Sequence, residues 1–512
     1  MSFLTIPNRS VFLRVSDEIN AALNRHIRLV VVLFVLLFLA CTIVQDIRKP
    51  MWVDEFYTLY TSRQATPAEI YKATIDGCDS MLLYDMTVHA ILPVVRIDEL
   101  AVRLPATLGF CCMIVFLLAF CRRRLPTDYA MAAALLACNA QLMYSTEGRG
   151  YGVVLGCAAG ALLCWQYAME GRHRILAIPM LAFCAALMTA MHYYSIFFWI
   201  PLLLAEMARW RSSRKLDWAI LAAMTPVLFV LALHYQLIMA GAPIQKHFFS
   251  PAQWSSIPAC YIECFGTMMV CCIFPAAVLA VFSTIPDDRS AKQSSLIPSE
   301  WVALGAFSLM PLCVIVLAKY STHMFVSRYV LWAVPGVAIL LVALLCRVAR
   351  GRAVVGVSLL GLMVAYVAAA EVKHMLQKPE LTKGEATLQS LASLPDGTEP
   401  IVVADAHVFL ELSYYAESRI QKRLVYPVNP ALDLRYYGND TSPLILQALS
   451  HYTKLRIVPY DEVVAAHPRF VLAALPINYM PWYLIESGYR VVPIGSPKIP
   501  LLFEVEAPRA KN

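Results

Sequence analysis

Charged residues are scarce in this chain of 512 residues. They make up only 15% of the sequence, whereas 59% of the residues are hydrophobic. An average soluble domain carries roughly 25% charged residues, so the shortage excludes an ordinary soluble protein as the class of the whole chain. The hydrophobic excess lies in apolar runs of about 17–25 residues, which is the length with which a helix crosses a bilayer.

Several recognisable sites are also missing. The sequence has no Gly-rich phosphate-binding loop, so a nucleotide-sugar or ATP site is not expected. It has no Cys/His spacing of the zinc type. Of its 15 cysteines, fourteen lie in or beside apolar runs and only Cys78 does not, which excludes a disulfide framework. A cysteine in such a run behaves as a small hydrophobic residue. Neither an internal repeat nor a low-complexity segment is present.

The apolar runs predict an α-helical polytopic membrane protein with about eleven transmembrane helices. The first run, near residues 29–46, is too long for a signal peptide, and no small-residue cleavage site follows it. We therefore expect it to be a retained span. The other ten are expected near residues 102–121, 127–145, 151–169, 175–191, 193–209, 217–238, 258–283, 300–319, 328–346 and 353–371.

The loops between these runs form two alternating sets. The first set is Arg122–Arg124 and residues 171–174, 209–215, 287–292 and 347–352. Four of these five loops are basic, which favours the cytoplasm. The second set, expected outside, is residues 46–100, 145–150, the turn near His192, 239–257, 319–328 and the C-terminal segment. The pattern predicts a multi-pass membrane protein with a cytoplasmic N-terminus. The size of the chain and its lack of eukaryotic loop features lead us to expect a bacterial inner membrane.

Two domains are expected. Residues 1–372 form a transmembrane domain, and residues 373–512 form a small extracytoplasmic α/β domain. In the second domain, apolar stretches bounded by turn residues predict five strands and two helices. The strands are expected at 401–404, 424–427, 470–474, 490–493 and 501–505, and the helices at 407–416 and 442–451.

The basic excess belongs to the membrane part of the chain. The segment from Lys373 onward carries 14 basic and 14 acidic residues, which leaves 28 basic and 21 acidic residues before it. This excess lies in loops, so it indicates orientation and not nucleic-acid binding. Within the outer loop at 46–100, the apolar stretch Met81–Val95 is short and holds Asp85 and His89. We expect it to lie along the outer interface without crossing the membrane.

Ionisable residues of the spans gather near one end. Arg103, Glu147, Arg149, Glu263, Lys319 and Arg328 all fall near the expected outward ends. Lipid penalises charge heavily, so such residues mark functional sites. A proton-coupled transporter would place some of them at mid-depth. The pattern therefore predicts a site at the outer leaflet that is open to both lipid and water.

The densest candidate is Trp52–Tyr57, just after the first span. If a helix begins here, Asp54 lies at its N-terminus, where a carboxylate is favoured. Phe56, Leu59 and Tyr60 would then form an apolar stripe, with Asp54, Tyr57, Thr58 and Thr61 facing the other way. An interfacial helix with ordinary capping acids explains the same pattern, and spacing alone leaves both interpretations open.

Five segments together resemble one family. In chain order they match an acidic motif of the first external loop (Trp52–Tyr57), an "RLP" entry into the second span (Ala101–Ala106), an "S-x-E-x-R-x-Y" turn (Tyr144–Tyr151), an "HYY" turn (His192–Tyr194) and a late "RY" (Ser327–Tyr329). The chain is similar here to the C-type (GT-C fold) membrane glycosyltransferases. These include protein O-mannosyltransferases and the transferase that adds aminoarabinose to lipid A. The resemblance covers roughly residues 29–370.

Two features depart from the family pattern. Family members often carry a "PP" pair near the position of residues 80–84, and this chain has none. The aminoarabinose branch favours a second acidic residue shortly after the arginine of the turn, whereas Glu147 here precedes Arg149. The sequence therefore does not favour that branch.

The resemblance implies transfer of a sugar, with inversion, from a polyprenyl-phosphate donor to a hydroxyl of a protein, lipid or glycan. Asp54 would act as the base, with Glu55 supporting or substituting for it. Arg149, Arg328 and Lys319 would pair with the departing phosphate, so no metal or other cofactor is required. The other side chains expected to contact substrate are Glu147, Tyr57, Tyr151, His192 and Arg103.

Structural roles compete with these assignments. Arg328 can snorkel from a span end, Lys319 can be a membrane anchor, and His192 can be an interfacial hydrogen-bonding residue. Arg103 can hold the outer loop against the second span. At the level of class, the rivals are a transporter or flippase of lipid-linked saccharides and a non-catalytic scaffold.

Overall fold

The chain divides into two sets of segments that each fold as a compact unit. The computed structural model describes residues 9–77, 81–245, 247, 250–282, 296–376, 382–392, 397–494 and 502–508. Unit 1 comprises Met1–Ile47, Arg103–Tyr235 and Ser250–Gln377, and unit 2 comprises Arg48–Val102, Gln236–Phe249 and Lys378–Asn512. The expected loop at 287–292 lies outside the described residues.

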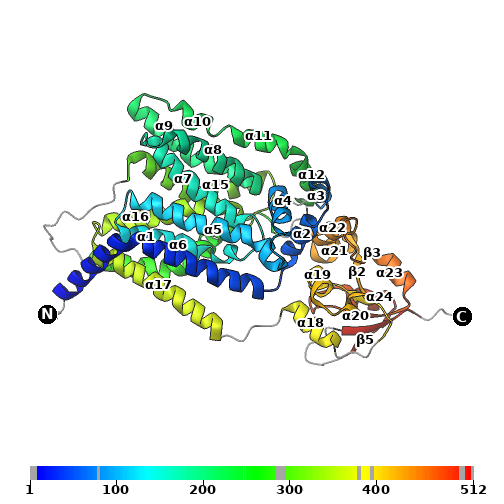
Figure 1. Cartoon of the computed structure of the whole chain (residues 1–512). Helices are drawn as coiled ribbons and strands as arrows, with labels where there is room; N and C mark the ends of the chain where they lie inside the picture. The colour runs from blue at the N-terminus through cyan, green and yellow to red at the C-terminus, as the bar shows by residue number, and fades with distance from the viewer. Residues whose placement is uncertain are drawn as a thin grey trace. The chain divides into compact units, whose positions relative to one another are not determined.

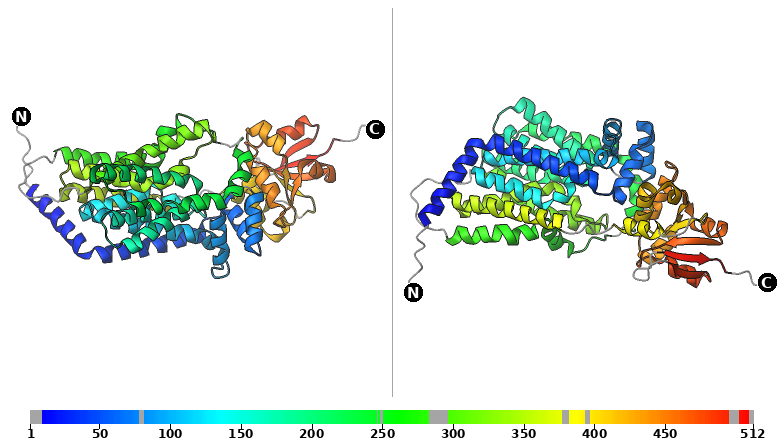
Figure 2. Two further views of the ribbon diagram at one scale, coloured as in Figure 1. Left: turned by 90° about the horizontal axis from the view of Figure 1, so that it is seen from above. Right: turned by 60° about the horizontal axis from the view of Figure 1, so that its bottom comes forward.

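Unit 1 is a bundle of helices that run side by side in the views of Figures 1 and 2. Most of them are apolar along their length, because the sequence between the charged loops offers few polar side chains. The helices are α1 (Arg9–Arg48), α5 (Asp98–Arg122), α6 (Thr127–Ala140), η1 (Leu142–Ser145), α7 (Tyr151–Met169), α8 (Arg174–Met191), η2 (Tyr193–Phe198), α9 (Trp199–Ser213), α10 (Trp218–Ala222), α11 (Pro226–Leu233), α12 (Tyr235–Gln245, mostly in unit 2), α13 (Ser256–Met268), η3 (Met269–Ile273), α14 (Phe274–Phe282), α15 (Pro298–Tyr320), η4 (Ser327–Ala333), α16 (Val334–Val348) and α17 (Ala353–Leu376).

Fewer spans than expected meet the length and composition of a membrane crossing. Among the described residues there are seven such helices, or eight if the pair Trp218–Leu233 and Tyr235–Gly241, bent by 56°, is one span. Three of the eleven expected spans are not among them: α6 and α9 have only 14 and 15 residues, and the apolar part of α17 is the shorter stretch Ala353–Ala369. Helices α6 and α9 are roughly 21–23 Å long, shorter than the hydrocarbon core of about 30 Å. Both still pack inside the bundle, α6 against α16 and α17, and α9 against α15.

Small residues let α5 and α7 approach closely. A Cβ atom at Gly152 would lie 2.2 Å from the carbonyl oxygen of Ala106, and one at Gly156 would lie 2.3 Å from that of Gly109. Close backbone contact of this kind is a usual source of packing energy between membrane helices, where no hydrophobic effect drives association. The contact fixes the start of α7, and with it the turn that carries Arg149, against α5.

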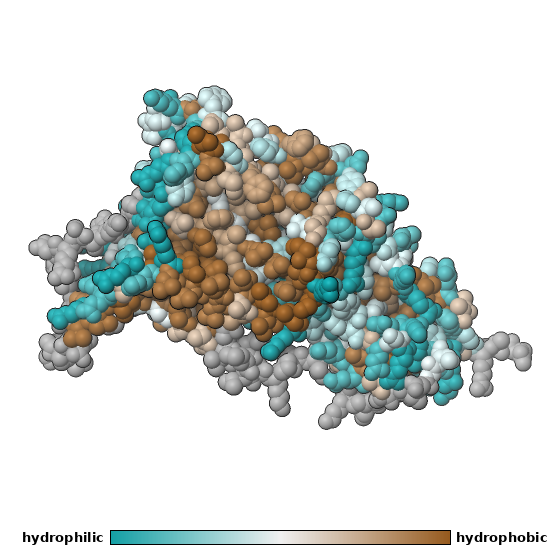
Figure 3. All heavy atoms as spheres, in the orientation of Figure 1, coloured by the Kyte–Doolittle hydropathy of each residue, from teal (hydrophilic) through white to brown (hydrophobic). Residues whose placement is uncertain are grey.

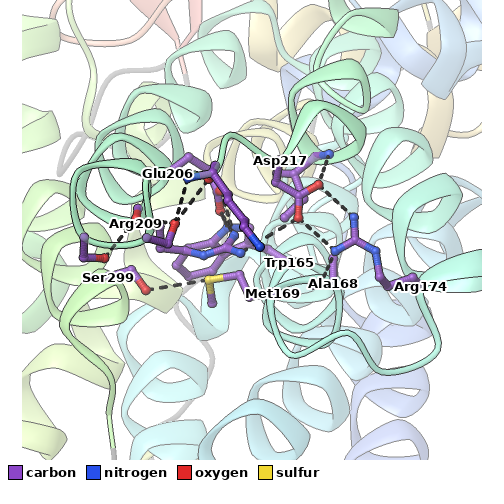
Figure 4. Close-up of polar contacts among 12 residues, drawn as sticks. Trp165, Ala168, Met169, Arg174, Glu206, Arg209, Asp217 and Ser299 are labelled. Atoms are coloured by element: carbon purple, nitrogen blue, oxygen red, sulfur yellow. Dashed lines mark hydrogen bonds and ion pairs between the residues drawn. The ribbon is translucent and has the colours of Figure 1, made fainter.

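Two of the expected cytoplasmic loops, residues 171–174 and 209–215, meet in one charged network (Figure 4). Arg174 donates to Asp217 at 2.7 and 2.8 Å, Arg209 donates to Glu206 at 2.7 Å, and the indole of Trp165 donates to Glu206 at 2.8 Å. Loops that the charge pattern assigns to one face therefore lie together at one end of unit 1.

The surface of unit 1 carries broad apolar areas. Figure 3 shows hydrophobic residues gathered over much of its visible face. On α1, Leu33 and Leu37 are 57% and 65% exposed, and Phe229 on α11 is 66% exposed. Apolar exposure of this extent is typical of a surface that faces lipid. The protein is a multi-pass membrane protein.

Unit 2 contains a six-stranded mixed sheet in the order β3-β2-β1-β4-β6-β5. The first four strands of this order are parallel, whereas β6 is antiparallel to β4 and β5. The strands are β1 (Ile401–Val403), β2 (Leu424–Val428), β3 (Ile457–Pro459), β4 (Arg469–Ala473), β5 (Arg490–Ile494) and β6 (Leu502–Glu506). All five expected strands and both expected helices form, whereas β3 was not expected. The fold-class prediction, a helical membrane protein with a small α/β domain, is confirmed.

Helices surround this sheet and extend unit 2. Along the chain they are α18 (Lys383–Ala392), α19 (Ala406–Tyr415), α20 (Ser418–Gln421), α21 (Pro430–Tyr437), α22 (Thr441–Leu449), α23 (Tyr460–Ala466) and α24 (Met480–Glu486). The outer loop joins the same unit as α2 (Val53–Ser62), α3 (Pro67–Asp76) and α4 (Leu82–Ile91). Each of these three has 10 residues, about 15 Å, so none can cross the bilayer.

Candidate functional site

The turn that carries Arg149 is held in place by backbone hydrogen bonds. It lies between η1 and α7, where the apolar run stops and Ser145–Gly150 brings polar residues together. The Thr107 hydroxyl of α5 donates to the Ser145 carbonyl at 2.9 Å, and the Arg149 amide donates to the Glu147 carbonyl at 2.7 Å. The turn therefore presents Glu147 and Arg149 from a fixed backbone at one end of the bundle.

Aromatic rings from three segments meet beside this turn. His192, which ends α8, lies 5.9 Å from the ring of Tyr151 and 5.4 Å from that of Tyr329. Tyr194 stacks on Tyr329 at 4.7 Å, and its hydroxyl lies 3.0 Å from the Thr322 hydroxyl. The start of α7, the end of α8 and the start of η4 thus form one wall of rings.

Arg328 and Arg149 both lie close to this wall. The guanidinium carbon of Arg328 is 5.8 Å from the centre of the Tyr151 ring. Burial, together with the positive charges of Arg328 and Arg149, lowers the pKa of His192 to about 3. The imidazole is therefore neutral at physiological pH and can accept or donate a hydrogen bond beside two cations. The structure brings together Arg149, Tyr151, His192 and Arg328, and their contact with a substrate stays a prediction.

Glu147 belongs to the same cluster. Its side chain is 5% exposed. Burial raises the pKa of Tyr144, and the Glu147 carboxylate raises it further while Arg328 lowers it. The Tyr144 ring lies 5.2 Å from that of Tyr151. The Glu147 carboxylate and the Arg328 guanidinium, which both influence Tyr144, therefore lie near the same group of rings. The cluster combines two cations with one anion around a neutral histidine.

Lys319 and Arg103 make structural contacts. The Lys319 ammonium lies 5.3 Å from the centre of the Trp254 ring, a cation–π contact that fits an anchor at the end of α15. Arg103 is fully buried and donates to the Asp46 carbonyl at 2.6 Å, while the Thr107 hydroxyl oxygen lies 3.0 Å from the Asp46 carboxylate. This geometry fits the role of tying α5 to the end of α1.

Some residues of the cluster were not predicted as site residues. Tyr194 and Tyr329 lie within the "HYY" and "RY" motifs, and a rule that counts every aromatic of those motifs would have found them. Glu263 accepts a hydrogen bond from the Ser327 hydroxyl, next to Arg328. In the sequence, only the position of Glu263 at the outward end of its expected span indicates that it belongs to the site.

The acidic motif begins a helix in unit 2. Asp54 and Glu55 lie in the first turn of α2, and Glu55 Oε2 accepts a hydrogen bond from the Trp52 amide at 3.1 Å. Glu55 is fully buried, and its carboxylate caps the N-terminus of α2. Asp54 is half-buried, and its carboxylate accepts no hydrogen bond from any described residue. Of the two acids, Asp54 is the one available to a ligand.

The face of α2 opposite the expected apolar stripe is buried as well. Phe56 and Leu59 are fully buried as expected, but Thr58 is also fully buried and Tyr57 is only 8% exposed. Both faces are covered because α2 packs against α4 on one side and α19 on another. The Phe56 ring contacts Tyr414 at 5.7 Å. The helix is thus part of the core of unit 2.

Asp54 belongs to unit 2 and the two arginines to unit 1, so their convergence stays a prediction. Among the described residues, no group of three or more His, Cys, Asp or Glu side chains is placed to hold a metal ion.

Together, the bundle of membrane helices and the small α/β unit define a class of fold that is known from solved membrane proteins. Two solved structures share it: ArnT from Cupriavidus metallidurans in the apo state, with a TM-score of 0.52, and the same protein bound to undecaprenyl phosphate, with a TM-score of 0.51. Each is 12% identical to this chain, and each comparison covers 94% of this chain and 98% of the other. No protein-family model and no curated protein matches the chain. At 12% identity the likeness shows the fold, and the choice of branch stays a prediction.

Proposed function

We propose that this protein is a glycosyltransferase that moves a sugar from a polyprenyl-phosphate donor to a hydroxyl acceptor at the outer face of the membrane. The observation that supports this best is the cluster of Arg149, Arg328 and neutral His192 at one end of the helix bundle. Such a cluster fits a phosphate that must stay near the membrane while its lipid tail remains in hydrocarbon. The likeness in fold to a protein solved with undecaprenyl phosphate supports the same donor class.

The chemistry assigns a role to each group. As the bond from the anomeric carbon to the phosphate breaks, negative charge grows on the departing phosphate, and Arg149 and Arg328 stabilise it. The acceptor hydroxyl attacks the opposite face of the sugar, which inverts the anomeric carbon, and Asp54 takes its proton. Glu147 positions Arg149, and Tyr57, Tyr151 and His192 line the sugar and phosphate. No metal or other cofactor is required in this scheme.

The test replaces Asp54 with Asn. The amide keeps the shape of the side chain but takes up no proton at neutral pH, so transfer should fall about a hundredfold or more. The measurement is mass spectrometry of cell-envelope lipids and glycans from cells that carry wild type, the variant or no gene, looking for one missing sugar.

Asp461→Asn is the matched control, because Asp461 also lies in the first turn of a helix of unit 2. This control should restore the sugar, and Asp54→Asn should not, although both proteins should be present in the membrane in equal amounts. A transporter or flippase has no need of the base, so full complementation by Asp54→Asn would favour that alternative.

A further inference from the structure

A cavity of about 920 Å³ lies in unit 2, away from the Asp54 end of α2. Its lining includes the chain at the C-terminal end of α2 and residues of α19. The rim is the chain just before β2 and β3, with Lys422, Lys454 and Arg456. A volume of this size is within the range of small-molecule and headgroup sites, roughly 300–1,000 Å³.

Every charged residue that lines this cavity carries a basic side chain. These are Arg63, Lys422, Lys454 and Arg456, and no Asp or Glu belongs to the lining. The clustering is local, because the chain from Lys373 onward has equal numbers of basic and acidic residues, 14 of each. An even mixture of charges over the surface would have placed carboxylates among these cations.

Most of this charge is not neutralised within the unit. Arg63 pairs with Asp98. Lys422 and Lys454, by contrast, form no ion pair with any described residue, and Arg456 donates only to the backbone carbonyl of Lys422, at 3.2 Å. This hydrogen bond places the Arg456 guanidinium beside the backbone of Lys422 and neutralises the charge of neither side chain. An anion bound in the cavity would be attracted by the combined charge of these cations.

Neutral groups complete the lining. Burial raises the pKa of Tyr60 to about 12, and the nearby Asp98 also raises it although Arg63 opposes this, so its hydroxyl remains a donor at physiological pH. The rings of Phe409 and Tyr452 lie in the same cavity. Aromatic faces beside cations suit a sugar ring that carries an anionic group.

We infer that this cavity binds a phosphate-bearing glycan or headgroup with two or more negative charges, and that it thereby holds the acceptor. That the cavity holds the acceptor rests on the proposed function, whereas the binding of an anion does not. Three unpaired cations on one rim favour a diphosphate or two neighbouring phosphates over a single carboxylate. The acceptor would then be recognised by its charge in unit 2, separately from the phosphate of the donor in unit 1.

The test measures binding of radiolabelled inorganic pyrophosphate to the full chain in phosphatidylcholine nanodiscs by equilibrium dialysis. The variant Lys422→Gln/Lys454→Gln/Arg456→Gln should lose affinity by about tenfold or more. The control Lys383→Gln/Arg435→Gln/Arg490→Gln removes the same charge from the same unit outside the cavity, and it should bind as wild type does. Equal affinity of the two triple variants, or no binding to wild type, would overturn the inference.

Two further arms separate the sources of the anion and the two proposals. If cardiolipin, a lipid with two phosphates in its headgroup, displaces pyrophosphate from wild type when it is present in the nanodisc but has no further effect on the cavity variant, the site serves a lipid headgroup. If it does not displace pyrophosphate, the site serves a glycan phosphate in solution. Asp54→Asn should bind pyrophosphate normally because Asp54 does not line the cavity. Loss of transfer and loss of anion binding are therefore separate results.

Discussion

At the scale of single residues, the site of unit 1 depends on a histidine that is kept neutral. His192 is only 7% exposed, and its surroundings contain Arg149 and Arg328. A third cation here would repel the other two, and it would compete with them for the phosphate of the donor. The low pKa is therefore a consequence of building an anion site around an imidazole.

This arrangement makes stability depend on pH. In the unfolded chain His192 would titrate at its ordinary pKa of 6.5, whereas in the folded protein its pKa is about 3. Between these values the unfolded state binds a proton that the folded state does not, so stability is lost as the pH falls below 6.5. For this residue the loss should reach about 2 kcal/mol at pH 5 relative to pH 7.

The variant His192→Gln removes this dependence. The difference in free energy of unfolding between the variant and wild type should shift by about 2 kcal/mol in favour of the variant when the pH falls from 7 to 5. The measurement is the midpoint of thermal unfolding in detergent for both proteins at several values between pH 7 and pH 5. A constant difference between the two proteins over this range would show that the imidazole is not held neutral.

At the scale of helices and strands, periodicity and charge predicted most of the elements. The expected strands at 401–404 and 424–427 form as β1 and β2 because each is a short, mostly apolar run of strand length. The strand β3 has only three residues and ends on Pro459, so it carries too little pattern to be recognised. The two-sided burial of α2 could not be predicted, because its second face is covered by α19, more than 300 residues later in the chain.

The contact between α5 and α7 gives a prediction at this scale. Gly152→Ala would place a methyl group 2.2 Å from the carbonyl oxygen of Ala106, so the helices must move apart at a cost of about 1–3 kcal/mol. The turn with Arg149 would move with α7, and transfer should fall as well.

Gly305→Ala in α15 is the control, since its added methyl group meets no atom within 4 Å. This change should leave stability unchanged or raise it by up to about 1 kcal/mol, because alanine is the better helix former. Thermal unfolding of the two variants in the same detergent compares them directly. Equal midpoints would mean that close approach of α5 and α7 contributes nothing measurable.

At the scale of the whole molecule, the proposed catalytic site requires residues of both units. The sequence predicted which residues of unit 1 come together, because the turn, the "HYY" segment and the "RY" segment all fall at one end of apolar runs. It also predicted that the outer loop does not cross the membrane. It did not predict that this loop packs with the C-terminal segment in one unit, since nothing in a local pattern reports contacts between residues more than 300 positions apart.

Catalysis as proposed requires the Asp54 end of α2 to meet the turn at the start of α7. A crosslinking experiment tests this in a background whose 15 native cysteines are replaced by alanine or serine. The pair Asp54→Cys with Glu147→Cys should react with a short bismaleimide. The pair Asp54→Cys with Arg174→Cys should not, because the 19 residues of α7 separate the two ends of the bundle by about 28 Å. Crosslinking of the second pair in preference to the first would place the carboxylate at the wrong end of the bundle and end the catalytic proposal.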